Sequence, residues 1–285
     1  MGLVLFYTFC ALGCSALNDL VFKFFARKER SRGLFVTVIG ICGTICFAFL
    51  PGKFTGNLQA TIRWGIICGI FSAVGNILLI ESMTKLSAGV CSTIYRLNLA
   101  LVVPFSMLFL HESLRISQYS GIVLAISAVL LFMSRQKESR SGTGSLLLPM
   151  VMIVTACIFR AGLGLSMKYA PQFAGASENG VNFIIEILWI ISGLIYFFIK
   201  ERKNCRPDLK LAAYGGLSGV LVAGILLFTA LALNTPGGKA SVVLPIAQMS
   251  FLATFVLSAI FLKEKITLRK IIALACGAAA MFLLA

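Results

Sequence analysis

Residues 88–114 read AGVCSTIYRLNLALVVPFSMLFLHESL, and residues 240–266 read ASVVLPIAQMSFLATFVLSAIFLKEKI. Aligned without gaps, the two stretches are offset by 152 positions. Both are long apolar runs, and both end on the same pattern, Phe109-Leu110-His111-Glu112 in the first and Phe261-Leu262-Lys263-Glu264 in the second. The chain therefore contains an internal repeat.

A second pair of matches lies in the segment that precedes each of these stretches. Gly65 and Gly69 correspond to Gly215 and Gly219 at an offset of 150 positions. Each pair has three residues between its glycines, a spacing that lets membrane helices approach closely. The repeat therefore extends over at least two consecutive segments of each half.

The composition indicates a membrane protein. Of the 285 residues, 59% are hydrophobic and 12% are charged, whereas a soluble domain carries about 25% charged residues. A spanning helix needs about 20 apolar residues, and we read the first segment as such a helix rather than as a signal peptide. The sequence predicts an all-α integral membrane protein with ten transmembrane helices, at 2–24, 33–50, 61–83, 87–110, 118–134, 145–168, 180–199, 211–233, 239–262 and 269–285.

Five helices per repeat fix the relative orientation of the two halves. Because five is odd, the second copy enters the membrane in the opposite sense to the first. We therefore predict two inverted repeats, residues 1–140 and 141–285. Inverted repeats underlie alternating access in many secondary transporters, in which the substrate site lies near the bilayer midplane.

Basic residues predict the topology. The formal net charge is +15, but the basic residues lie in short connections between apolar segments, which favours contact with lipid headgroups over nucleic acid. Odd-numbered connections hold 18 Lys and Arg residues and even-numbered ones hold 5. The positive-inside rule then places the odd connections in the cytoplasm and both termini outside it.

The matched segment ends carry a family resemblance. The Pro-bearing segment, the Leu-x-Glu ends at Glu112 and Glu264, and the small-residue helix that comes after each resemble the drug/metabolite transporter superfamily, in its ten-helix EamA-like branch. The second half has Ala273 where the first has Gly121. The resemblance implies a secondary transporter, with export as the direction, that moves small metabolites, amino acids, nucleotide sugars or drugs across a cell (inner) membrane.

Arg96 is the first candidate for substrate binding, because charged residues inside spanning helices are costly and often functional. Its planar guanidinium suits a carboxylate or phosphate, so we predict a site for an anionic or zwitterionic substrate such as an amino acid. Its neighbours would be Tyr95, Asn98 and its repeat partner Gln248, with Asn76 deep enough to line the same cavity. The alternative for Arg96 is a structural ion pair with an intramembrane acid.

Three further charged residues are candidates for ion coupling or ion pairing. Glu186 could carry a coupled proton or pair with Arg160, and Arg160 could instead complete the cavity. Asp19 could act in coupling or be a solvated helix-end acid near Lys23. Pro104 and Pro245 fall inside predicted helices and could expose backbone carbonyls to a cavity.

Several other classes are disfavoured by what the sequence contains. It shows no catalytic or ATP-binding motif, and its nine cysteines and lone histidine give no metal-ligand set, so we expect no enzyme activity, metal or cofactor. A lipid or lipid-linked headgroup flippase stays as an alternative, and a membrane-embedded enzyme is the least favoured. The expected partners are a small-molecule substrate, the bilayer and, if transport is proton-coupled, a proton, with the oligomeric state open.

Overall fold

The computed structural model describes residues 2–25, 30–83, 86, 91, 94–132, 147–202, 208–262 and 268–284, and every regular element in these ranges is helical. The predicted repeat boundary at residues 140 and 141 lies outside them, as do Lys263 and Glu264. The helices are α1 (Gly2–Phe25), α2 (Arg32–Ala48), α3 (Leu58–Met83), α5 (Asn98–Phe109), α6 (Ile116–Phe132), α7 (Leu147–Ala174), α8 (Glu178–Tyr196) with the short π-helix η1 (Phe197–Glu201), α9 (Leu209–Asn234), α10 (Ala240–Gln248), α11 (Ser250–Leu262) and α12 (Leu268–Leu284).

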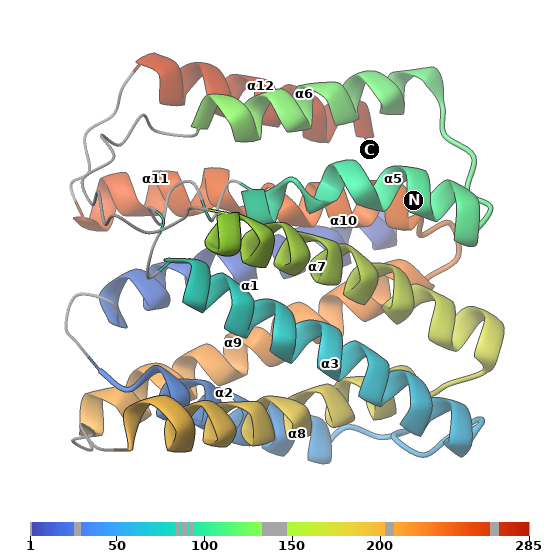
Figure 1. The fold of residues 1–285 in the computed structure, drawn as a ribbon. Helices are drawn as coiled ribbons and strands as arrows, with labels where there is room; N and C mark the ends of the chain where they lie inside the picture. Colours follow the sequence, from blue (N-terminus) through green and yellow to red (C-terminus); the bar gives the residue numbers. More distant parts are fainter. Residues whose placement is uncertain are drawn as a thin grey trace.

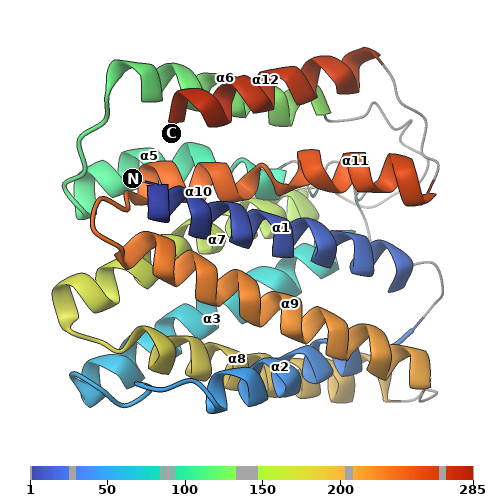
Figure 2. The same cartoon turned by 180° about the vertical axis from the view of Figure 1, so that it is seen from behind.

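The helices run roughly along one direction and form a bundle (Figures 1 and 2). At one edge α6 pairs with α12, and at the opposite edge α2 pairs with α8. Between these edges α1 packs on α9 and α3 packs on α7. The helix pairs α5/α7 and α1/α11 complete the centre, which encloses a small cavity.

The helix contacts are reciprocal between the two halves of the chain. The first helix of the first half, α1, packs on the third helix of the second half, α9. In the same way, the first helix of the second half, α7, packs on the third helix of the first half, α3. The matched glycines obey the same rule, since Gly65 and Gly69 of α3 face α8, whereas Gly215 and Gly219 of α9 face α2. The close approach that these glycines predict is therefore found in the structure.

The described connections between helices separate the two ends of the bundle. Residues 49–57, 110–115, 175–177 and 235–239 all lie at the end that holds the N-terminus, on the right in Figure 1. Hydrogen bonds from Asn57 to Gly175 and from Ala240 to Glu112 link them. At the other end Arg30 pairs with Asp208 at 3.0 Å. We call these the outer and inner ends, after the predicted topology.

Length and composition support a multi-pass membrane protein. Among the residues that the structure describes, six helices are long and apolar enough to cross a bilayer, and four shorter apolar helices accompany them. Three predicted segments differ most from the structure. The expected helix 87–110 is broken at Leu97, and α5 begins at Asn98. α7 continues to Ala174 rather than ending at 168, and the expected single helix 239–262 is broken at Met249 into α10 and α11.

α2 and α8 pack at backbone contact. A Cβ atom at Gly40 would lie 2.7 Å from the backbone nitrogen of Ile190 and 2.8 Å from the carbonyl oxygen of Glu186. At Gly33 it would meet the backbone of Phe197 at a similar distance. Small residues at such sites allow the dispersion contacts that hold membrane helices together.

We predict that Gly40→Ala lowers the thermal stability of the purified protein, by about 1–3 kcal/mol, since overpacking against backbone cannot be relieved by a rotamer change. Gly13→Ala on α1 is the matched control, because a Cβ there meets nothing within 4 Å. That control should keep or slightly raise the melting temperature, since alanine favours a helix over glycine. Equal melting temperatures for the two variants would contradict the α2–α8 contact.

Candidate functional site

Two helix breaks occur at matched positions of the repeat. Leu97 precedes α5 and Met249 separates α10 from α11. Leu97 N donates to Ile94 O at 3.1 Å and Ala100 N to Leu97 O at 2.9 Å, and the equivalent bonds run from Met249 to Ile246 at 3.0 Å and from Leu252 to Met249 at 2.9 Å. Pro245 lies four positions before its break, whereas Pro104 lies within α5, seven positions beyond Leu97.

The second break makes a backbone carbonyl available for a side chain. Leu252 N donates to Met249 O, whereas a regular helix would use the carbonyl of Gln248. The Gln248 oxygen instead accepts a hydrogen bond from Arg96 Nη1 at 3.1 Å. A guanidinium from the first half is therefore bound to the helix break of the second half.

Arg96 forms an ion pair with Asp19 of α1. Its Nη2 lies 2.7 Å from Asp19 Oδ2, and the two side chains are 19% and 27% exposed. Nη1 also reaches Ser250 Oγ at 3.3 Å, and the guanidinium carbon lies 5.3 Å from the centre of the Phe251 ring. Most of the donor capacity of Arg96 is thus used within the protein, which corresponds to the ion-pair alternative for this residue.

Asp19 is accordingly held by protein groups rather than left as a solvated helix end. Besides Arg96, the hydroxyl of Thr254 donates to its Oδ2 at 3.2 Å. Ser15, one turn earlier on α1, donates to Ser250 at 3.0 Å. The expected neighbour Lys23 has a side chain outside the described set. These contacts tie α1 to α11 toward the inner end of the bundle.

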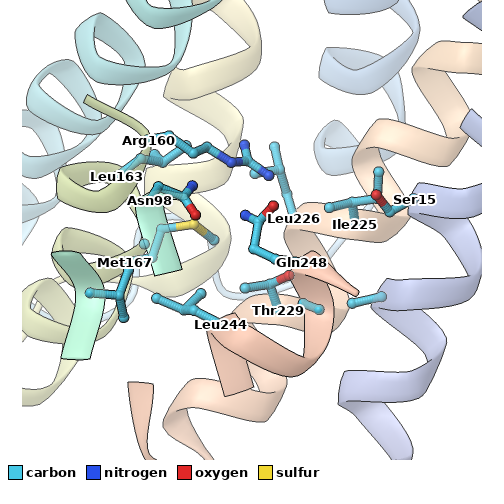
Figure 3. Close-up of a pocket in the computed structure, with 14 residues that line it drawn as sticks. Ser15, Asn98, Arg160, Leu163, Met167, Ile225, Leu226, Thr229, Leu244 and Gln248 are labelled. Atoms are coloured by element: carbon cyan, nitrogen blue, oxygen red, sulfur yellow. The ribbon is translucent and has the colours of Figure 1, made fainter. Parts of the chain in front are cut away.

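A small central cavity lies beside this ion pair, toward the outer end, between α1, α5, α7, α9 and α10. Its volume is about 50 Å³. Arg160, Asn98 and Gln248 point toward one another across it, and Ser15 and Thr229 lie along the wall (Figure 3). Apolar side chains fill the rest of the lining. Two of the residues predicted for the substrate site, Asn98 and Gln248, therefore line one cavity with Arg160.

Arg160 occupies the position in the cavity that was predicted for Arg96. Its guanidinium carbon lies 6.0 Å from the centre of the Tyr95 ring. Tyr95 is thus a neighbour of Arg160, outside the cavity lining. Among the described residues no acid forms an ion pair with Arg160, and neither carboxyl oxygen of Glu186 has a hydrogen-bond partner, so the structure does not join these two predicted partners.

Glu186 and Asn76 lie away from the cavity. Glu186 is fully buried in α8 and packs on Gly43 of α2. Asn76 donates through Nδ2 to Ser72 O of its own helix at 2.8 Å, and it is absent from the cavity lining. The position of Asn76 in the sequence indicates only how deep it lies along α3. The direction in which its side chain points depends on how α3 packs against its neighbouring helices.

A buried charged network at the outer end was missed by the sequence analysis. Lys168 Nζ of α7 lies 2.6 Å from Glu112 Oε1, and the two side chains are 9% and 5% exposed. Glu112 also accepts from Ala240 N at 2.6 Å and from Ser241 N at 2.9 Å, so it caps the first turn of α10 from the other half of the chain. The available signal was a lysine and a glutamate at the ends of apolar segments, which does not indicate that the two side chains meet.

These contacts keep Glu112 ionised. Burial raises the pKa of its carboxyl, but the hydrogen bonds from Lys168 and Ser241 outweigh burial, and its pKa lies below the ordinary glutamate value. A polar pocket of about 530 Å³ opens on the same end, with His111, Lys239 and Gln172 in its lining. Glu112 and Lys168 line this pocket and are absent from the lining of the central cavity.

Comparisons with known proteins match the chain to a family model, a relative and a solved structure. The model of the EamA-like transporter family matches residues 2–134 and again 147–285. An uncharacterized protein of Methanocaldococcus jannaschii is 34% identical over 97 residues, which cover 33% of this chain and 71% of that protein. A solved crystal structure matches with a TM-score of 0.80 at 12% identity, over 98% of this chain and 95% of that one, and shows a shared fold.

Members of the matched family are membrane transporters of the drug/metabolite type and are typically not enzymes. The two matches of the family model together cover almost the whole chain, one in each half. The protein belongs to the EamA-like transporter family.

Proposed function

We propose that the protein is a secondary transporter, acting as an exporter, for a small anionic or zwitterionic metabolite such as an amino acid. It works by alternating access between two inverted five-helix repeats, residues 1–140 and 141–285. It spans a cell (inner) membrane ten times with both termini outside the cytoplasm. The observation that carries the proposal is the guanidinium of Arg160 facing Asn98 and Gln248 in a central cavity.

The reciprocal contacts support the inverted repeat. Matched glycines pack on matched helices, and the matched breaks at Leu97 and Met249 have the same hydrogen-bond pattern. In transporters built this way, the substrate site lies at the interface of the repeats and is formed by broken helices. The cavity has this character, because Asn98 begins the helix after one break and Gln248 ends the helix before the other.

The chemistry of the cavity favours a carboxylate. Arginine remains charged in any protein environment and presents a planar fork of donors that matches a carboxylate. The side-chain amides of Asn98 and Gln248 can donate to the same anion or accept from an ammonium group. An α-amino acid carries both groups, which is why a zwitterion fits this set of side chains.

The size of the cavity supports an occluded conformation. About 50 Å³ accommodates a few water molecules, whereas small-molecule sites usually span about 300–1,000 Å³. Substrate entry therefore requires the surrounding helices to separate. Asp19 and Lys168 lie beyond the cavity-lining residues Ser15 and Met167, toward the ends of α1 and α7, so the ion pairs Arg96–Asp19 and Glu112–Lys168 lie toward the inner and outer ends. We propose that each closes one side and opens when the other is formed.

A headgroup flippase is the second candidate, because one groove suits an acyl chain. It has a volume of about 430 Å³ and is lined by Trp64, Phe71, Phe105, Phe109 and Tyr169 among others. It uses the face of α7 that carries Phe159 and Leu165, while the cavity uses the face that carries Arg160 and Leu163. Saturable transport of a soluble substrate in vesicles of the purified protein would exclude this alternative.

We predict that Arg160→Gln weakens the binding of carboxylate ligands by about tenfold or more, since a hydrogen bond to a charged group contributes about 1.5–3 kcal/mol. Thermal-shift assays measure this with L-amino acids and dicarboxylates, each beside the analogue whose carboxylate is an amide. A ligand at 100 times its dissociation constant stabilises the native state by about 2.7 kcal/mol.

The exposed Arg63 of α3 provides the matched control, because Arg63→Gln removes the same charge away from the cavity. Arg160→Lys should recover only part of the affinity, since the ammonium lacks the planar fork. Equal stabilisation of wild type and Arg160→Gln, or by carboxylates and their amides, would rule out this anion site.

We predict opposite changes in cavity access when the two ion pairs are neutralised. A Thr229→Cys variant introduces a thiol in the cavity wall, and its labelling by a membrane-impermeant maleimide is compared in vesicles of both orientations. Glu112→Gln with Lys168→Gln should raise labelling from the outer side at least severalfold, and Asp19→Asn with Arg96→Gln from the inner side. Both residues of a pair are changed because a single change strands a buried charge.

The same labelling without Thr229→Cys measures the background from the native cysteines. If both double variants increase labelling from one side only, or if neither changes it, the two ion pairs do not close the cavity.

A further inference from the structure

Glu186 differs from Asp19 and Glu112, because the fold gives it no partner of opposite charge. It is 0% exposed, and neither carboxyl oxygen has a hydrogen-bond partner among the described residues. The amide of Asn182, one turn earlier on α8, is also buried and without a described partner. Two adjacent polar side chains on one helix are therefore enclosed by the bundle.

The carboxyl packs directly on the backbone of α2. A Cβ at Gly43 would lie 2.3 Å from Glu186 Cδ, and the two carboxyl oxygens are within 2.7 Å of the same point. Such close contact leaves no room between the carboxyl and α2 for a hydrated metal cation. A proton needs no additional space, and it removes the charge whose burial is so costly in a low-dielectric interior.

The titratable groups around Glu186 do not offer a compensating positive charge. The thiols of Cys42 and Cys46 on α2 interact with it electrostatically, and thiols are neutral or negative. The charged residues of the other helices that contact α8 are engaged elsewhere or exposed. Glu81 pairs with Lys200, Lys168 with Glu112, and Glu201 accepts from Ser31, while Arg160 lines the cavity and Arg63 and Lys210 are exposed. Of the neutral titratable groups, Cys68 lies beside Ser166, Tyr169 packs on Trp64, and Tyr214 lies in the first turns of α9.

We infer that Glu186 is a proton-binding site in the α2–α8 contact, separate from the substrate cavity, and that its protonation state is linked to the packing of these two helices. The cavity lining contains no residue of α2 or α8. The proton is taken from water onto the carboxylate when α2 and α8 close, and it returns to water when they separate. This inference deepens the proposed function, because it names the group through which protons could couple to transport without competing for Arg160.

Trp189 reports on this site. It lies three positions after Glu186 on α8, is buried, and donates through Nε1 to Ser72 Oγ of α3 at 2.7 Å. The chain has two tryptophans, Trp64 and Trp189. A Trp64→Phe background therefore leaves a single tryptophan, three positions from Glu186 on α8, and its emission can be measured as a function of pH without any substrate.

We expect the Trp64→Phe protein to show a pH-dependent change in Trp189 emission that adding Glu186→Gln abolishes. The glutamine has nearly the same shape and stays neutral, and circular dichroism and size-exclusion chromatography check that the variant is folded. Glu178→Gln, an acid-to-amide change at the start of the same helix, is the matched control and should retain the transition. A transition that survives Glu186→Gln, or its absence in the Trp64→Phe protein, would overturn the inference.

Adding Arg160→Gln separates this inference from the proposed function. If the two sites are distinct, the transition remains in that variant although carboxylate binding is weakened. Loss of the transition on Arg160→Gln would show that the proton site depends on the cavity and would overturn their separation. Failure of every carboxylate to stabilise the protein would instead count against the proposed substrate class and leave the titration of Glu186 intact.

Discussion

The structure depends on one constraint, which is that a charge enclosed within the membrane must be matched by the protein. Hydrocarbon offers no hydrogen bonds, and an uncompensated charge there is costly. The chain meets this constraint differently at each site. Arg96 is matched by Asp19 and a backbone carbonyl, and Lys168 by Glu112 and the carbonyl of Gly238. Arg160 faces amides across a cavity, and Glu186 is surrounded by apolar helix packing.

The two ion pairs also show how the repeats are joined. Asp19 lies near the end of α1 and Lys168 near the end of α7, which are the first helices of the two halves. The two helices run in opposite senses through the bundle, so these residues lie at opposite ends of it (Figure 1). Each ion pair also includes one residue from the fourth predicted segment or the connection after it. Arg96 lies beside the helix break at Leu97, and Glu112 lies in the connection between α5 and α6. The same topological element therefore supplies charge to both sides of the cavity.

Features that depend on residue type along one helix could be predicted from the sequence. These are the apolar segments, the close packing at the matched glycines and the family, since periodicity and composition determine them. The rotation of each helix about its axis could not be predicted. Arg96 and Arg160 both lie in apolar segments. Asp19 reaches Arg96 because α1 packs on α10 and α11, whose break at Gln248 and Ser250 binds the same guanidinium. Asn76 was misplaced for the same reason, since its amide bonds within α3.

The pairing of Arg96 has a consequence for substrate specificity. If Arg96 faced the cavity together with Arg160, two guanidinium groups would favour a doubly charged ligand such as a phosphate. With Asp19 matching Arg96, one positive charge remains in the cavity beside the two neutral amides. A ligand shifts a conformational equilibrium only through its differential affinity for the states. In the transport cycle that we propose, a single carboxylate would balance the charge of Arg160 as the helices separate and reclose, whereas a cation would add to the positive charge already present.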